Sequence, residues 1–190
     1  MKKILLITLV ALLGTATANA QIKFGAKAGV NLSTITDASD TELKFGFHVG
    51  GFAEFTITDV IGIQPEILYS TQGANDKNSD GGISLGYINV PVLLKVKLVE
   101  GLSAEVGPQV GFLLSSKAES EDVSISMKDY TNSLDVSAAV GLSYTFAEKF
   151  VVGARYNFGL TKIYKESENF DLDGAKPKNS VIQISFGYKF

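Results

Sequence analysis

The sequence predicts an all-β protein: an eight-stranded antiparallel up-and-down transmembrane β-barrel, preceded by a cleavable signal peptide. Three observations predict this fold class. Apolar residues recur at every second position through most of the chain, which is the period of a β-strand. The alternating segments are about as long as the 9–11 residues that a tilted strand needs to cross a bilayer. The connections between the segments alternate in length, as they do in barrels with long loops on one side.

The start of the chain has the three parts of a secretory signal. Lys2 and Lys3 give a positive start, residues 4–13 form a short apolar stretch, and Ala18-Asn19-Ala20 is a small-x-small cleavage site. The apolar stretch is too short for a transmembrane helix, which needs about 20 residues. We therefore expect two parts, a signal peptide in residues 1–20 and an outer-membrane β-barrel in residues 21–190.

Composition excludes several classes of protein. The chain of 190 residues has no cysteine, so it forms no disulfide and lacks the residue on which a bacterial lipoprotein anchor is built. Removal of residues 1–20 takes away two lysines, which leaves 15 basic residues against 20 acidic ones, a net charge of 15 − 20 = −5. A mildly acidic chain without a basic tract does not support nucleic-acid binding. Attachment to a membrane must then come from the fold itself.

Four alternating segments occupy the first half of the expected barrel. Residues 22–32 place Ile22 and Phe24 on one face, and Lys23 and Lys27 on the other. The same alternation continues in residues 45–57, 61–70 and 88–98. Proline removes a donor from the hydrogen-bond ladder of a sheet. We therefore expect a local β-bulge at each of the three prolines that lie inside the expected strands. These prolines are Pro65, Pro91 and Pro108.

Four further segments complete the barrel: residues 102–114, 134–146, 150–160 and 182–190. Their polar face, like that of the first four, is rich in Gly, Ser, Asn and Gln and has few charges. A soluble sandwich would turn a charged face toward water and would have shorter strands, of about 5–6 residues. The uncharged polar face suits a narrow enclosed lumen better.

Long and short connections alternate along the chain. The long ones are residues 34–44, 73–82, 116–133 and 162–179, and the short ones are residues 58–59, 99–101 and 147–149. Outer-membrane barrels have long outer loops and tight periplasmic turns. We therefore expect the four long loops to face outside the cell and both ends of the barrel sequence to lie on the periplasmic side.

Four stretches resemble a known family. They read IQPEILYSTQGA (residues 63–74), YINVPVLLK (87–95), GPQVG (107–111) and GARYNFGL (153–160). With these stretches the chain resembles the porin-family, PorT-like outer-membrane β-barrel domain of the Bacteroidetes group. The resemblance implies an outer-membrane barrel and the three strand prolines, and it suggests a place in an envelope secretion or assembly machine. The word porin in the family label is no evidence of a pore.

Six charged residues fall on the expected inner face: Lys27, Glu54, Glu66, Lys95, Glu105 and Arg155. Paired carboxylates can perform acid–base chemistry, but inside a narrow barrel a salt-bridge network that fills the lumen is the simpler interpretation. Geometry brings Lys95 near Glu66 and Glu105, and Arg155 across the barrel from Glu66. We expect these side chains to plug the lumen.

Two other motifs carry weaker chemistry. His48 is the only histidine, on the inner face near the outer rim, and any Ser/His lipid hydrolase would depend on it. Asp76, Asn78 and Asp80 match the opening of a calcium loop, but Tyr87 stands where the bidentate glutamate is needed. Residues 169–174 are a poorer copy of that loop. The sequence therefore predicts no catalytic residue and no cofactor, and it predicts metal ligands only in this weak form.

The chain ends with an alternating strand whose last residue, Phe190, is aromatic. We expect Phe190 to be an assembly signal read by the barrel-assembly machinery, with a simple place in the aromatic girdle as the alternative. The predicted function is an integral outer-membrane barrel with a structural or surface-interaction role. Its partners would be outer-membrane lipid and an envelope or extracellular protein that binds the long loops. A secretion-machine component, a lipid-modifying enzyme and a narrow solute channel are the alternatives.

Overall fold

The structure is a computed structural model that describes residues 21–37, 41–78, 81–120, 123–164 and 176–190. The expected signal peptide, Asp80 and residues 169–174 lie outside the described residues. The strands in chain order are β1 (Gln21–Thr36), β2 (Thr41–Glu42), β3 (Lys44–Thr56), β4 (Ile61–Asp76), β5 (Gly82–Val99), β6 (Leu102–Ser120), β7 (Val123–Ser126), β8 (Leu134–Phe146), β9 (Phe150–Gly159) and β10 (Lys178–Lys189).

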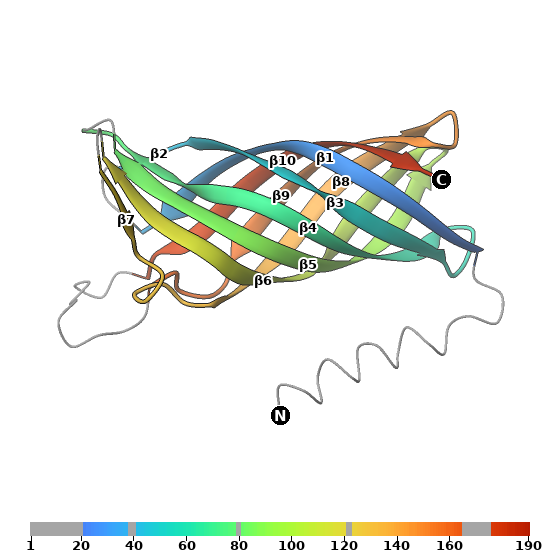
Figure 1. Cartoon of the computed structure of the whole chain (residues 1–190). Helices are drawn as coiled ribbons and strands as arrows, with labels where there is room; N and C mark the ends of the chain where they lie inside the picture. The colour runs from blue at the N-terminus through green and yellow to red at the C-terminus, as the bar shows by residue number, and fades with distance from the viewer. Residues whose placement is uncertain (1–20, 38–40, 79–80, 121–122, 165–175) are drawn as a thin grey trace, which may run out of the picture.

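Eight long strands close into one antiparallel barrel (Figure 1). Around the wall the order is β4, β3, β1, β10, β9, β8, β6 and β5, and the pairing of β4 with β5 closes the circle. The first and last long strands are neighbours, with Ala28 opposite Phe186. The short strands β2 and β7 pair only with β4 and β6 among the described residues. The predicted eight-stranded up-and-down barrel is confirmed.

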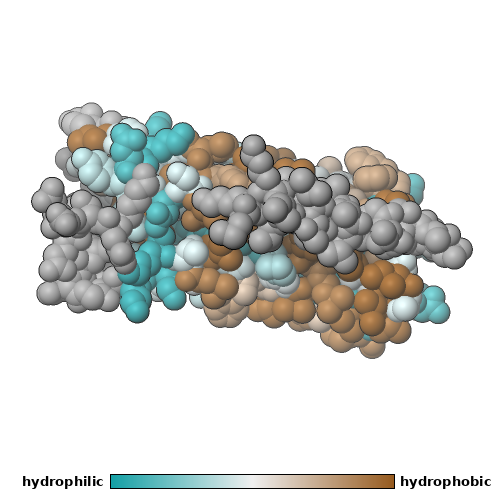
Figure 2. All heavy atoms as spheres, turned by 90° about the horizontal axis from the view of Figure 1, so that it is seen from below, coloured by the Kyte–Doolittle hydropathy of each residue, from teal (hydrophilic) through white to brown (hydrophobic). Residues whose placement is uncertain are grey.

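The apolar face of each strand points away from the lumen. Phe24, Ile67 and Ile184 are 60%, 63% and 54% exposed, whereas Glu66 and Gln183 are 1% and 2% exposed. This distribution is the reverse of that in a water-soluble protein, and it matches a wall that faces lipid. Figure 2 shows the apolar side chains as a broad brown band, bordered near one end by a belt of polar side chains.

No helix among the described residues is long and apolar enough to span a membrane.

The two ends of the barrel differ (Figure 1). We call the end with the three short connections, residues 57–60, 100–101 and 147–149, the turn end. The first residues of β1 and the chain terminus after β10 also lie there. The opposite end, with β2, β7 and the other connections, is the loop end. The alternation of short turns with the other connections thus has the predicted arrangement.

Three neighbouring strands rise above the others at the loop end. β4, β5 and β6 have 16, 18 and 19 residues, whereas β8, β9 and β10 have 13, 10 and 12. The strands therefore continue into two predicted loops: only residues 77–81 connect β4 to β5, and β6 and β7 pair within residues 116–133. These two expected loops therefore contain strand residues, and one of the short stretches, Val123–Ser126, alternates between apolar and polar residues.

The expected bulges at the three prolines are wrong. Pro91 pairs with Gln109, and Leu94 pairs with Val106 in the same register, so no residue is inserted between them. Because proline has no N–H group, a hydrogen bond of the ladder is lost at these positions, but the register of the strands does not change. The register shifts of this strand pair lie instead between Gly86 and Tyr87 and between Lys97 and Val99.

Candidate functional site in the barrel lumen

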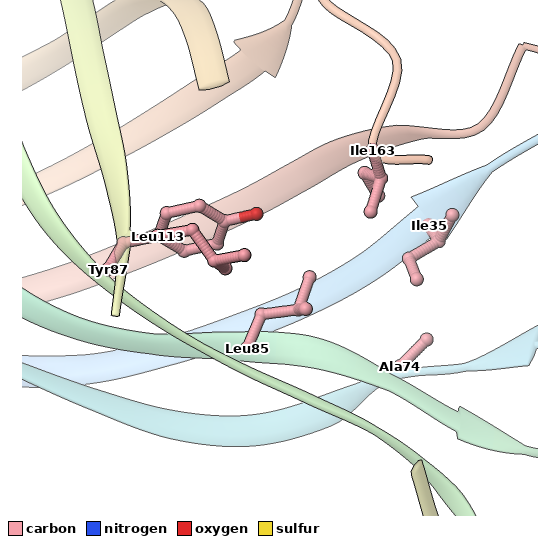
Figure 3. Packing of buried hydrophobic residues seen from close by; sticks show 6 residues of the cluster. All are labelled: Ile35, Ala74, Leu85, Tyr87, Leu113 and Ile163. Carbon is pink, nitrogen blue, oxygen red and sulfur yellow. The ribbon is translucent and has the colours of Figure 1, made fainter. Parts of the chain in front are cut away.

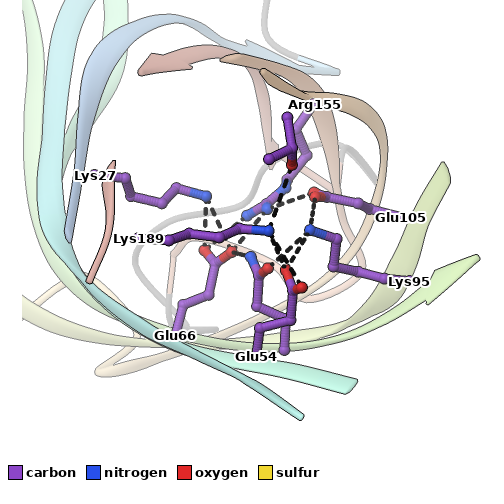
Figure 4. Close-up of polar contacts among 9 residues, drawn as sticks. Lys27, Glu54, Glu66, Lys95, Glu105, Arg155 and Lys189 are labelled. Atoms are coloured by element: carbon purple, nitrogen blue, oxygen red, sulfur yellow. Dashed lines mark hydrogen bonds and ion pairs between the residues drawn. The ribbon is translucent and has the colours of Figure 1, made fainter. Parts of the chain in front are cut away.

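A buried carboxylate, Glu66 of β4, lies at the centre of the lumen. Both of its oxygens accept hydrogen bonds from the Arg155 guanidinium, at 3.0 and 2.9 Å, and both accept from the Lys27 ammonium at 3.0 Å. The side chain of Glu66 is 0% exposed. The expected bridge from Arg155 across the barrel to Glu66 is present, in the bidentate form that fixes a guanidinium most firmly. Figure 4 shows these groups meeting on the barrel axis.

A second carboxylate, Glu54 of β3, lies among lysines. The Nζ atoms of Lys95 and Lys189 lie 2.8 and 3.0 Å from a Glu54 oxygen. Glu105 joins the two groups, since its carboxylate lies 2.8 Å from Arg155 and 3.7 Å from Lys95. All these partners are drawn together in Figure 4. We call these seven side chains the ionic layer: Lys27, Glu54, Glu66, Lys95, Glu105, Arg155 and Lys189.

The ionic layer brings together all six charged residues that the sequence singled out, with two differences. Lys95 contacts Glu54, Glu105 and Gln64, rather than the expected Glu66. Neither Lys189, a member of the layer, nor Gln64, which bonds to it, was predicted. Gln64 donates to Glu66 at 2.7 Å and accepts from Lys95 at 3.1 Å. Both have the inner-face parity of their strands, and that signal was sufficient to find them.

Uncharged polar side chains lie next to the ionic layer, toward the loop end. His48 is 1% exposed, and its Nδ1 lies 2.8 Å from Oδ1 of Asn31. Asn31 donates in turn to Ser70 and to the backbone oxygen of Thr71, at 3.0 and 2.8 Å. Nε2 of His48 is buried without a partner. Its contacts are those of a packed lumen residue, and among the described residues its ring bonds to the Asn31 amide rather than to a hydroxyl.

A buried carboxylate also lies nearer the loop end. Asp135 accepts hydrogen bonds from Asn179 at 3.0 Å and from Thr161 at 2.8 Å. Asn179 also lies within 3.4 Å of the Tyr87 hydroxyl. Among the described residues, the partners of Asp135 are thus a hydroxyl and an amide rather than a cation. These bonds tie the connection after β9 to the start of β8 and β10.

An apolar cluster fills the lumen at the loop end (Figure 3). We call it the apolar layer, and its members are Ile35, Ala74, Leu85, Tyr87, Leu113 and Ile163. Five come from the inner face of β1, β4, β5 and β6, and the sixth comes from the connection after β9. Ile163 is 2% exposed. Sequence analysis did not predict this layer.

Asn132 holds the connection that carries Ile163. Its backbone N–H donates to the Ile163 oxygen at 2.7 Å, and its side-chain amide donates to the oxygens of Lys162 and Tyr164 at 2.8 and 3.1 Å. A bridge between Thr131 and Tyr164 lies beside these bonds. The two connections thus form one hydrogen-bonded clasp over the loop end of the lumen.

The calcium-loop candidates have simple local roles where they are described. Asp76 ends β4, and its Oδ1 accepts a hydrogen bond from the Asn78 backbone N–H at 2.8 Å, which forms a side-chain turn. Tyr87, at the position of the required glutamate, is buried in the apolar layer. Among the described residues no group of three or more His, Cys, Asp or Glu side chains is arranged to hold a metal.

Phe190, the expected assembly signal, lies at the turn end. Its side chain is 76% exposed, and its backbone N–H donates to the Phe24 oxygen at 2.8 Å. Its ring meets that of Tyr188 at 5.8 Å between centroids. Tyr188 and Phe150 extend the aromatic row along β10 and β9, with centroids 5.3 Å apart. Phe190 therefore occupies a girdle position and also helps to close the barrel.

A closed antiparallel barrel with an apolar outer surface and a charged, buried interior defines the class of transmembrane β-barrels. Residues 17–165 match the family described as the outer membrane protein beta-barrel domain, and the chain belongs to this family. It is accordingly an outer-membrane protein whose wall contacts the lipid of the bilayer.

Solved structures of small outer-membrane barrels share the fold. Ail, the attachment invasion locus protein of Yersinia pestis, is 18% identical, with 88% of this chain and 98% of that chain covered and a TM-score of 0.52. Neisserial surface protein A is 13% identical, with 90% and 99% covered and a TM-score of 0.57. A structure of Ail in complex with the heparin analogue sucrose octasulfate is 16% identical, with 90% and 99% covered and a TM-score of 0.51. No curated protein sequence matches the chain.

Proposed function

We propose that the protein has a structural or surface-interaction role in the outer membrane, with a lumen plugged by side chains. The observation that supports the plug is that two successive layers of buried side chains lie in the lumen. Seven charged side chains from seven strands meet at the ionic layer, and the apolar layer lies toward the loop end. An eight-stranded barrel is only wide enough to be filled by side chains, whereas aqueous pores need about 16–18 strands.

The raised part of the wall supports a role in surface contacts. Leu43, Ile125 and Tyr130 at the loop end are 53%, 59% and 59% exposed. Exposed apolar groups contribute to a protein-binding surface when they form one contiguous patch. The four expected loops hold eight lysines against thirteen Asp and Glu residues, which disfavours a sulfated sugar such as the one bound to Ail. An extracellular or envelope protein is the better partner.

A capture experiment on intact cells tests this role. The variant Leu43→Ser/Ile125→Ser/Tyr130→Ser should reduce capture of surface partners or adhesion at least several-fold, with the barrel still folded. A matched variant with three substitutions on charged loop residues, Glu42→Gln/Lys77→Gln/Lys128→Gln, should change it little. Unchanged adhesion and capture in the apolar variant would contradict the surface role.

A component of a secretion or assembly machine is the second candidate. The likeness of the proline-containing stretches around Pro65, Pro91 and Pro108 to PorT-like barrels favours it. Deletion of the protein would then impair secretion of envelope proteins and leave adhesion of cells unchanged. Loss of adhesion alone would favour the surface role.

An enzymatic role has little support in the geometry. A lipid hydrolase needs a nucleophile activated by a base at the lipid side or the rim. His48 is buried in the lumen and bonded to Asn31. We therefore expect the lipid composition of cells that carry His48→Ala to equal that of the wild type, as lipid analysis would show.

We expect the barrel-assembly machinery to recognise Phe190 while the protein is inserted into the outer membrane. Deletion of Phe190 should sharply lower the folded, heat-modifiable form in cells, while folding of the purified chain in detergent survives. Phe158→Ala, which removes another exposed aromatic ring from the barrel wall, is the control. Normal assembly of the Phe190 deletion would refute the signal and leave Phe190 as a girdle residue.

A further inference from the structure

A small cavity lies beside the ionic layer and is lined by residues of β1, β3, β4, β6, β8, β9 and β10. Its volume is about 20 Å³, and its wall includes Lys27, Ser143, Gly153, Arg155 and Gly187. A cavity holds one water-sized species when it offers at least about 10–15 Å³, so there is space for one small guest. Two of the wall residues are glycines, and the absent side chains leave this space open.

Two buried polar atoms on the wall of the cavity have no partner. They are Nε of Arg155 and Oγ of Ser143, in residues that are 7% and 4% exposed. Both Nη atoms of the same guanidinium already donate to Glu66 or Glu105, so Nε is the guanidinium nitrogen without a partner. Because an Nε–H group can only donate a hydrogen bond, a ligand of this cavity must accept one. The Ser143 hydroxyl can donate a second one.

The charge of the surroundings selects the guest further. The ionic layer has four cations, Lys27, Lys95, Arg155 and Lys189, against the three carboxylates of Glu54, Glu66 and Glu105. Within this layer the cations therefore outnumber the carboxylates by one, and this excess positive charge favours a negatively charged guest. Glu105 also lines the cavity, but its oxygens already face Arg155 and Lys95.

We propose that this cavity binds one small monovalent anion of the halide class. The Arg155 Nε–H and the Ser143 hydroxyl donate to the anion, and the Lys27 ammonium lies on the same wall. A water molecule could accept the same hydrogen bonds, but it would leave the excess positive charge uncompensated. The site depends on the geometry of the ionic layer and is independent of any role in surface contacts.

Bromide identifies the guest directly. Crystals of the whole folded barrel grown in sodium bromide should give an anomalous difference peak in the cavity, within hydrogen-bonding distance of Arg155 Nε. At equal ionic strength, the melting temperature of the barrel in chloride or bromide should be about 3 °C higher than in gluconate. Gluconate is the reference because this anion is too large to enter the cavity. A non-anomalous water peak in the cavity, or equal melting in the three salts, would overturn the proposal.

Gly153→Ala fills the cavity without removing a charge. A Cβ at Gly153 would lie 3.1 Å from the Ser185 hydroxyl oxygen, which can rotate away. The variant should lose both the bromide peak and the salt-dependent melting. Gly62→Ala is the matched control, because its Cβ would also lie 3.1 Å from its nearest neighbour, the Phe55 backbone oxygen, and Gly62 does not line the cavity. It should keep both signals.

Ser143→Ala provides a second variant that leaves the space open. The loss of one hydrogen bond to a charged guest should weaken bromide binding at least about tenfold, as measured by the bromide dependence of melting. Salt-dependent melting that persists unchanged in both Gly153→Ala and Ser143→Ala would place the anion elsewhere and refute the site.

Discussion

The two layers of side chains in the lumen differ in chemistry and in the elements that supply their residues. The ionic layer takes one charged side chain from each of seven regular strands, so it is part of the barrel wall. The apolar layer depends on Ile163, which a hydrogen-bonded connection places among strand residues. The ionic layer is therefore built into the wall, whereas the place of Ile163 in the apolar layer depends on one connection.

The largest effect is expected from Glu66→Ala. This change leaves Lys27 and Arg155 without their shared carboxylate in a buried place, at a cost of roughly 3–5 kcal/mol. Thermal unfolding, followed by the loss of the heat-modifiable form on gels, should show a marked drop in melting temperature. Glu54→Ala is the control: its side chain is 16% exposed, so water can solvate its lysine partners and the loss should be smaller. Equal melting of Glu66→Ala and wild type would contradict the buried bridge.

A smaller effect on stability is expected from Ile163→Ala in the apolar layer. Truncation of a buried isoleucine costs about 2–5 kcal/mol in a rigid core, and the lower end applies here because a connection can adjust. The result should be local opening at the loop end, measured as faster amide exchange at Leu85 and Leu113. Amide exchange at Arg155, in the ionic layer, should stay slow. Faster exchange in both layers would show that they form one unit.

The smallest effect is expected from Asn132→Ala, which removes the side-chain bonds to Lys162 and Tyr164. At about 0.5–1.5 kcal/mol for a hydrogen bond, the clasp should loosen without melting the barrel. A cysteine placed at Ile163 should then react faster with a soluble thiol reagent than it does with Asn132 intact. Asn78→Ala, in another connection at the loop end, is the control. Equal labelling rates would mean that Asn132 does not hold the connection.

A sequence argument predicted the ionic layer because that layer follows the strand period. Lys27, Glu66 and Arg155 occupy inner-face positions of long alternating strands, and an eight-stranded closure forces their side chains toward one axis. Lys189 has the same inner-face parity on the last strand. The wall and its inner residues were therefore predictable from local periodicity.

The apolar layer was not predicted, for two physical reasons. Ile35 and Tyr87 lie on the same strand faces as Lys27 and Asn89, respectively. Because apolar residues on the polar face break the alternation, the sequence pattern predicts loops or strand ends at these positions. Ile163 is placed by bonds to Asn132, and such contacts between two connections follow no sequence period. The register shift beside Tyr87 likewise depends on pairing with β6 rather than on composition.

Planar-bilayer recording of the purified barrel tests the closed lumen most directly. Because the two layers act in series, the wild type, Glu66→Ala and Ile163→Ala should each show no steady conductance. The double variant Glu66→Ala/Ile163→Ala, which weakens both layers, should leak. Steady open-channel current through the wild type, together with unchanged melting of Glu66→Ala, would contradict a lumen closed by side chains.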